Sequence, residues 1–180
     1  MKAIVSSLFV ATALMLLQST GMAQQAEGAV TLDIHAERKC LDKEKKKDHN
    51  ATVTNEKWVY EVAIKNGSFR DLTGLSVEYR MYMKDDSIRT KSSKIPLRKK
   101  EGTTPIEPLA NLAVFKFQTE VMEIETSLLD SGWTYKDKGN KRQSKDSLYG
   151  IWLRVMKDGK MVAEFVTPPA LKEKEKWQAQ

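Results

Sequence analysis

Alternation of apolar and polar residues dominates the chain. In the segment 58–65 the large apolar side chains Trp58, Tyr60, Val62 and Ile64 occupy the even positions, and most odd positions are small or charged. A period of two residues is typical of a β-strand with one buried face. The segments 30–37, 75–84, 149–155 and 161–165 repeat this pattern. The sequence therefore predicts several half-buried strands.

Two turns are visible between these segments. Lys157-Asp158-Gly159-Lys160 separates the last two strands, and Asp-Gly suits the positive φ angles of a type I′ hairpin turn. Asn66-Gly67 predicts a second turn after the strand 58–65.

The stretch 112–129 permits two interpretations. Phe115 and Phe117 have one parity, whereas Met122 and Ile124 have the other. An irregularity near Thr119 or Glu120 would shift the parity within a long strand. The alternative is a helix over 120–129.

The stretches 85–108 and 130–147 show no alternation and are expected to be irregular, as is the lysine-rich stretch after Cys40. Residues 172–177 predict a solvated tail or a frayed helical turn beyond Pro168-Pro169. About seven short strands without a long helix indicate an all-β fold, an antiparallel β-sandwich.

Some residues resemble a known family. Asp146-Ser147-Leu148-Tyr149-Gly150-Ile151 is similar to the corner that opens the sixth strand of immunoglobulin-like domains. The run 59–83 resembles the fibronectin type III and immunoglobulin-like modules of secreted bacterial envelope proteins. The resemblance implies a buried Tyr149 that bonds backbone, and binding or spacing rather than catalysis. This sequence lacks the cysteine pair of true immunoglobulins, because Ile151 occupies one of the two cysteine positions.

Composition agrees with one globular domain, with 180 residues, 41% of them hydrophobic and 30% charged. Lys2, an apolar run from Ala3 to Leu17 and small residues at Gly21 and Ala23 predict a signal peptide over 1–23 that is cleaved before Gln24. An uncleaved anchor would need a longer apolar run. We expect a β-sandwich domain over 24–169, a charged tail over 170–180, and a secreted or periplasmic protein of bacterial type.

No catalytic set can be assembled from the sequence, so we expect no enzyme activity, metal or cofactor. Cys40 and His49 could form a pair, but an unpaired thiol beside a solvated loop is favoured. His35 is expected at the surface, and Glu120, Glu123 and Glu125 on the wet face of a strand. As an odd thiol in an oxidising compartment, Cys40 is expected to be buried or to link two chains in a disulfide-bonded dimer, and we favour partial exposure.

Positive charge and aromatic residues concentrate in the irregular stretches. Residues 84–101 carry a net charge of +4 and residues 133–146 one of +3. Such charge attracts polyanions, which for an exported protein include acidic glycans, anionic lipid and DNA. The second stretch supplies the candidate ligand-binding residues Trp133, Tyr135, Lys136, Lys138, Lys141 and Arg142. In the alternative interpretation, Trp133 caps the core and the lysines confer solubility.

Two functions follow from these observations. The first is a noncatalytic binding module for an anionic polymer, a glycan or a partner protein at the cell envelope. The second is a structural or assembly subunit that associates by pairing an edge strand. A secreted hydrolase is a distant third.

Overall fold

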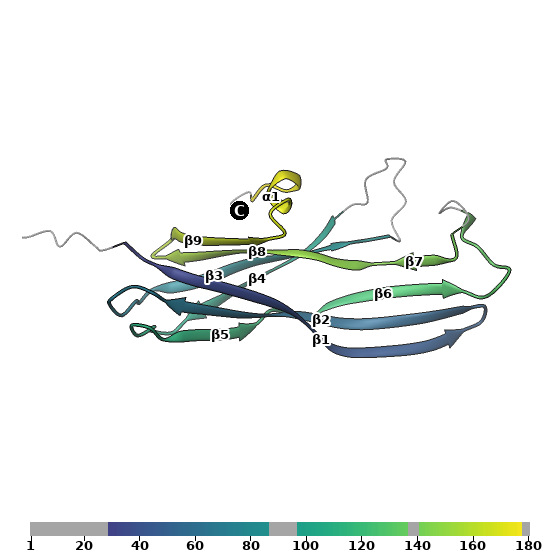
Figure 1. The fold of residues 1–180 in the computed structure, drawn as a ribbon, viewed down its shortest axis with the longest axis horizontal. Coiled ribbons are helices and arrows are strands. Elements are labelled where there is room, and N and C mark those ends of the chain that lie inside the picture. Colours follow the sequence, from purple (N-terminus) through teal and green to yellow (C-terminus); the bar gives the residue numbers. More distant parts are fainter. Residues whose placement is uncertain (1–28, 87–96, 137–140, 178–180) are drawn as a thin grey trace, which may run out of the picture.

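Two β-sheets pack face to face to form the molecule (Figure 1). The computed structural model describes residues 29–86, 97–136 and 141–177. Within them lie the strands β1 (Leu32–Asp48), β2 (Ala51–Asn66), β3 (Leu75–Lys84), β4 (Leu97–Ile106), β5 (Val114–Gln118), β6 (Met122–Leu129), β7 (Gln143–Lys145), β8 (Ser147–Lys157) and β9 (Lys160–Thr167), and the short helix α1 (Leu171–Lys174).

Every strand pairing is antiparallel. One sheet has the order β1-β2-β6-β7, with β5 also paired to β2, and the other has the order β4-β3-β8-β9. The predicted antiparallel β-sandwich is confirmed at this level. Its nine described strands exceed the predicted seven or so, because segments without alternation also pair.

Alternate residues of the central strands fill the space between the sheets. Val62 and Ile64 of β2 face Val77 and Met81 of β3, and each of these side chains is at most 2% exposed. Residues of β8 complete this cluster, with Ile151, Leu153 and Val155 fully buried. The period of two in the sequence therefore follows the core.

The junction between β5 and β6 confirms the predicted change of parity, and the alternative of a helix over 120–129 is wrong. Both strands pair with β2, one after the other. At the junction the backbone N–H of Tyr60 donates to the Thr119 hydroxyl over 2.9 Å. The backbone N–H of Glu120 donates to the Tyr79 hydroxyl over 3.0 Å. These side-chain bonds replace the ladder where the strand breaks.

The β8–β9 hairpin is also confirmed. Lys157 pairs with Lys160, and the two residues between them have positive φ, 50° at Asp158 and 77° at Gly159. Both values suit a type I′ turn.

Three stretches that the sequence indicated as irregular contain strands. The lysine-rich residues 43–47 were expected in a loop, but β1 continues through them to a turn at His49, whose φ is 46°. The stretch 85–108 contains β4, and 130–147 contains β7. The second half of β1 and most of β4 have no buried face, so strand pairing rather than apolar burial orders them. Their sequences therefore lack the alternation of apolar and polar residues.

The expectation of a buried Tyr149 in a backbone-bonded corner is wrong. A bulge opposite Tyr82 and Met83 shifts the register of β8, so Tyr149 joins the outer face while Ile151 stays in the core. The half-buried Tyr149 ring lies against two ammonium groups, 4.8 Å from Lys84 and 4.7 Å from Lys174.

The C-terminal residues cover the outer face of the second sheet. Leu171 of α1 is fully buried with Tyr82 and Trp152. The Trp177 ring meets Trp152 edge-on at 5.6 Å and lies 4.2 Å from the Arg80 guanidinium. The expected tail is thus a helical turn and an aromatic contact, anchored on the sandwich.

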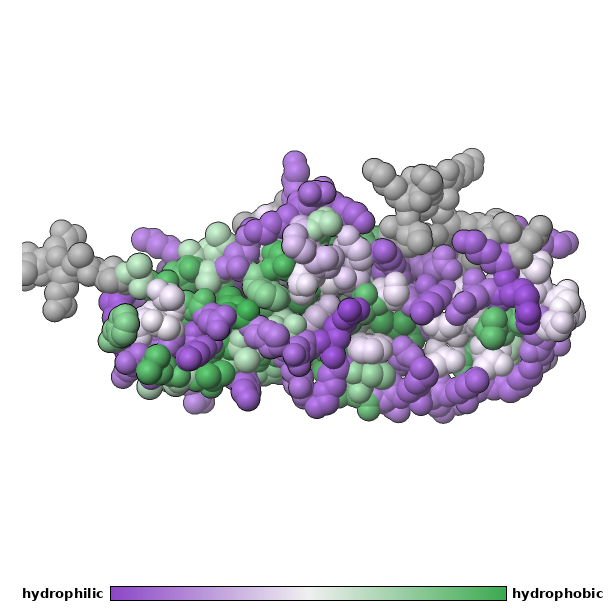
Figure 2. Space-filling model, in the orientation of Figure 1, coloured by the Kyte–Doolittle hydropathy of each residue, from purple (hydrophilic) through white to green (hydrophobic). Residues whose placement is uncertain are grey.

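The predicted signal peptide over 1–23 lies outside the described residues. Within the described ranges, none of the helices is long and apolar enough to cross a membrane. Figure 2 shows apolar surface mainly over the half where the two sheets overlap, and hydrophilic surface over the half where β6 and β7 lie.

Candidate functional site

The loop between β6 and β7 carries the predicted ligand-binding residues at one end of the molecule (Figure 1). Trp133 is 56% exposed, so the interpretation in which it caps the core is wrong. Tyr135 is half-buried, and its hydroxyl bonds the Ser127 hydroxyl over 2.7 Å. Lys136 and Lys141 are exposed, and Lys138 lies outside the described residues.

Backbone hydrogen bonds hold this loop against the β1–β2 turn. The N–H of Asp130 donates to the Asn50 carbonyl over 2.8 Å, and the N–H of Leu129 donates to the Arg142 carbonyl over the same distance. The Arg142 guanidinium donates to the Leu129 carbonyl over 3.0 Å. Tyr135 and Lys141 pair across the loop. The loop is therefore a defined surface, and it is continuous with the hairpin.

The structure adds a feature that the sequence interpretation missed. Because β1 continues to Asp48, its last lysine, Lys47, reaches the β6–β7 loop. The Lys47 ammonium contacts both carboxylate oxygens of Asp130, at 2.5 and 2.6 Å, across 83 residues of sequence. We call the combined surface, residues 43–50, 129–136 and 141–145, the basic tip. It has eight Lys and Arg against three Asp and Glu, a net charge of +5.

Carboxylates neutralise part of the basic tip. Lys43 pairs with Glu56 at 2.7 Å, and Lys46 pairs with Glu44 at 3.0 Å. The hydrogen bond from Lys43, with a second from the Trp58 indole, holds the pKa of Glu56 below its ordinary value. The same bond raises the pKa of Lys43.

Other cations at the tip remain available. In the described part of the chain, no carboxylate pairs with five of them, namely Lys45, Lys136, Lys141, Arg142 and Lys145. All five are exposed. Lys136, Lys141 and Arg142 lie in the same loop as the exposed Trp133 indole, an arrangement that suits an anionic ligand with rings to stack on.

An acidic cavity borders the basic tip. Its volume is about 650 Å³, and Asp42, Glu44, Glu56, Glu123 and Glu125 are among its lining residues. Positive charge is therefore concentrated toward the end of the molecule, and the neighbouring strand surface would repel the rest of a polyanion. Within the described ranges, no three His, Cys, Asp or Glu side chains are grouped so that they could hold a metal ion.

The Cys40–His49 pair does not form. Cys40 lies in the middle of β1 and His49 lies in the turn after it, nine positions further on, which corresponds to roughly 30 Å of extended chain. Cys40 is exposed, as the favoured interpretation predicted, and its thiol donates to the Asp42 carbonyl over 3.2 Å. His49 contacts Asp48 at 2.7 Å. Neither residue activates the other.

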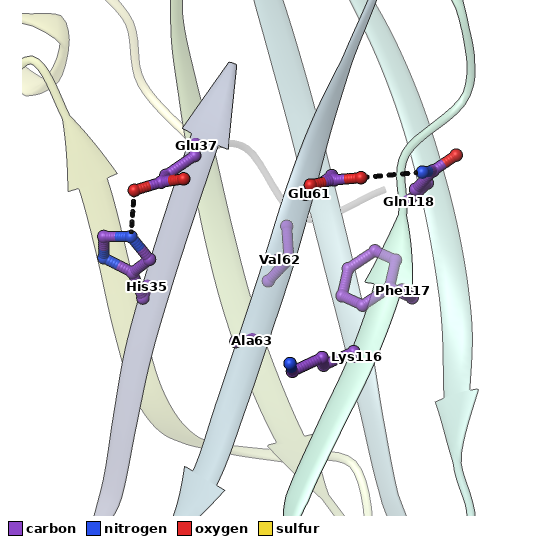
Figure 3. Close-up of a pocket in the computed structure, with 8 residues that line it drawn as sticks. All are labelled: His35, Glu37, Glu61, Val62, Ala63, Lys116, Phe117 and Gln118. Atoms are coloured by element: carbon purple, nitrogen blue, oxygen red, sulfur yellow. Dashed lines mark hydrogen bonds and ion pairs between the residues drawn. The ribbon is translucent and has the colours of Figure 1, made fainter. Parts of the chain in front are cut away.

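A shallow hollow of about 500 Å³ lies on the outer face of the first sheet (Figure 3). The small side chain of Ala63 forms its floor between two cross-strand neighbours, His35 and Lys116. His35 is at the surface, as predicted, and bonds Glu37 at 2.9 Å. Hydrogen bonds from Lys39 and from Gln118 lower the pKa of Glu61. His35 is thus paired with Glu37, and Glu61 with Lys39 and Gln118.

Comparison with known proteins gives no family. No family model matches the sequence, and no curated protein matches it. Among solved structures, a Bordetella pertussis protein provisionally named ApaA is 11% identical with a TM-score of 0.37, over 77% of this chain and 93% of that one. A Northeast Structural Genomics Consortium target is 7% identical with a TM-score of 0.37, over 83% and 96%. An Akkermansia muciniphila protein is 14% identical with a TM-score of 0.26, over 83% and 77%. None of these likenesses extends to a function.

Proposed function

We propose that this protein is a noncatalytic β-sandwich of the cell envelope that binds an anionic polymer or glycan at its basic tip. The observation that carries the proposal is the exposed Trp133, held in a loop that is hydrogen-bonded to a lysine-rich hairpin. The predicted signal peptide agrees with such a role.

The chemistry of the basic tip favours a polymer with both rings and negative charges. An exposed indole offers a flat apolar face on which a sugar ring or a base can stack. Lys141 and Arg142 follow in the same loop, and their charges act through solvent on successive anionic groups. Half-buried Tyr135, fixed by its bond to Ser127, supports the loop rather than offering a free face.

Replacement of Trp133 by Ala tests the proposal. With heparin and polygalacturonate as probes, we expect the affinity of the variant to fall roughly 5- to 150-fold, because one stacked ring contributes roughly 1–3 kcal/mol. The melting temperature should stay the same, since a side chain that is 56% exposed adds little to the core. The matched control is Phe69→Ala, which removes an exposed ring at the other end of the molecule.

Charge and salt give the second arm of the same experiment. Lys141→Gln with Arg142→Gln should weaken binding, while Lys65→Gln with Lys116→Gln should not. Raising salt to ~0.15 M, where the screening length is ~8 Å, should weaken the wild-type interaction severalfold. Binding to both probes that survives all the tip substitutions would contradict the proposal.

A second candidate function is assembly through the free edge of β1. This 17-residue strand ends the first sheet, and it carries the exposed Cys40. A partner strand could pair with that edge, and a disulfide could join two copies at Cys40. Its many lysines oppose pairing with a second copy in register, so the candidate ranks below ligand binding. Sedimentation velocity over a range of concentrations, with and without reductant, separates the two functions.

A further inference from the structure

The end of the molecule opposite the basic tip exposes several apolar side chains. Phe69 in the loop after β2 is 97% exposed, Leu112 in the turn before β5 is 60% exposed, and Val114, the first residue of β5, is 47% exposed. We call these three residues the apolar tip. Isolated exposed apolar residues are ordinary in proteins, but a group of them on neighbouring loops marks a contact surface.

Hydrogen bonds hold these loops in place, so the exposure belongs to an ordered structure. Asn66 is fully buried, and its side-chain amide donates to the carbonyls of Arg70, Leu109 and Ala110 over 2.8–3.1 Å. The N–H of Leu112 donates to the Asn66 carbonyl over 3.1 Å. One buried side chain thus joins the loop of Phe69 to the loop of Leu112.

The backbone of Leu112 is strained, and its side chain is exposed. Its φ is 62°, in the left-handed region that glycine and asparagine adopt more readily than leucine. Leucine here gains no compensation from the core, because most of its surface is exposed. Strain without packing indicates a constraint other than stability.

Lysines accompany the apolar tip. Lys65 is the cross-strand partner of Val114, and Lys116 lies two residues further along β5 on the same face. Both are exposed, and neither forms an ion pair within the described ranges. Protruding apolar side chains with flanking ammonium groups match a lipid surface, where rings and aliphatic chains enter the acyl boundary and lysines meet anionic headgroups.

The N-terminal end of the described chain lies beside the apolar tip. The N–H of Gly67 donates to the Thr31 carbonyl, and the N–H of Thr31 donates to the Ser68 hydroxyl, both over 2.9 Å. The first described residues therefore enter the fold next to Phe69.

From these observations we propose that the apolar tip docks the protein on the surface of an anionic lipid bilayer, with Phe69 and Leu112 inserted. This role is distinct from ligand binding at the basic tip. The molecule presents loop tips rather than a groove at this end, and a fluid bilayer can enclose separate protruding side chains without a complementary shape.

Flotation of the purified exported protein with phosphatidylcholine vesicles containing phosphatidylglycerol tests the proposal. We expect Phe69→Ser combined with Leu112→Asn to lower the bound fraction about tenfold or more, since both apolar anchors are lost. Asn suits the left-handed backbone at 112, so the melting temperature should not fall. Leu41→Ser, at a side chain that is 46% exposed on β1, is the matched control and should bind like the wild type.

Other variants separate this inference from the function of the basic tip. Lys65→Gln with Lys116→Gln should weaken vesicle binding, whereas Trp133→Ala should leave it unchanged. Failure of the protein to float, equal binding by the Phe69/Leu112 double variant, or binding that depends on Lys141 and Arg142 instead would each overturn the proposal. None of these outcomes would bear on the proposed function of the basic tip, which Trp133→Ala tests separately through polymer binding.

Discussion

The substitution Asn66→Ala tests whether the side chain of Asn66 holds the loops at the apolar tip together. The side-chain amide has two hydrogens and donates to three carbonyls, those of Arg70, Leu109 and Ala110, so one hydrogen is shared. Its oxygen accepts from the backbone N–H of Ser68 over 2.8 Å. The substitution removes all of these bonds inside the fold, where Asn66 is 0% exposed.

The expected cost follows from this count. Two full donations and one acceptance, at roughly 0.5–1.5 kcal/mol each, give a loss of about 3 kcal/mol in the free energy of unfolding. Water can reach some of the stranded carbonyls, because several of these bonds are half-buried, and this keeps the cost below the full desolvation penalty. For a domain of this size the melting temperature should fall by roughly 6–12 °C.

Urea unfolding followed by tryptophan fluorescence measures the change directly. The matched control is Asn55→Ala, on the same strand but exposed, which should cost no more than about 0.5 kcal/mol. The slope of the unfolding free energy against urea should be the same for both variants and the wild type. A loss below about 1 kcal/mol for Asn66→Ala, or one equal to that of Asn55→Ala, would refute the assigned role.

Two further predictions concern ionisable side chains. Burial raises the pKa of Tyr60 to about 12, above its value in the unfolded chain, so its contribution to stability is complete below pH ~10 and is lost as pH rises toward 12. Tyr60→Phe should therefore flatten the alkaline decline in melting temperature, and parallel curves for the two proteins would contradict the reasoning. Cys40 should react with a thiol reagent in the native protein at a rate near that of an unfolded control, since it is exposed on β1. Slow labelling that speeds up only on denaturation would show that the thiol is covered.

The strands that were predictable from sequence are those with one buried face. Alternation from Leu75 to Met83 located β3, and Asp158-Gly159 located the last hairpin, because apolar burial and turn chemistry are both local properties. The change of parity near Thr119 was equally visible, since a break in alternation is recorded in the sequence itself.

Segments that are ordered by their partners were not predictable. The lysines of β1 have no buried face, and their order depends on the pairing with Ala51–Lys57. β4 contains Gly102 and Pro105, which is tolerated because β4 is an edge strand. Tyr149 was misassigned because a bulge exchanged the two faces of β8 after Leu148. In each of these cases the structure of the segment depends on its pairing with a neighbouring strand.

The candidate site also has residues that were predictable from sequence and residues that were not. Trp133 and the cations that follow it were identified from composition alone, and the structure leaves the indole exposed. Lys47 of β1 was not assigned to that site, because its contact with Asp130 joins residues 83 positions apart. Asn66 gave a turn signal through Asn66-Gly67, but its burial depends on carbonyls of the distant loop at 109–110.

The length of β1 and β2 keeps the two proposed surfaces independent. Each strand has 16 or 17 residues, which corresponds to roughly 55 Å, and the two strands run from the region beside the apolar tip to the turn of the basic tip. Charges separated by this distance interact negligibly at physiological salt, where the screening length is ~8 Å. Substitutions at one end should therefore not alter binding at the other. The geometry accordingly suits a spacer, with one end at a lipid surface and the other extended toward an anionic polymer.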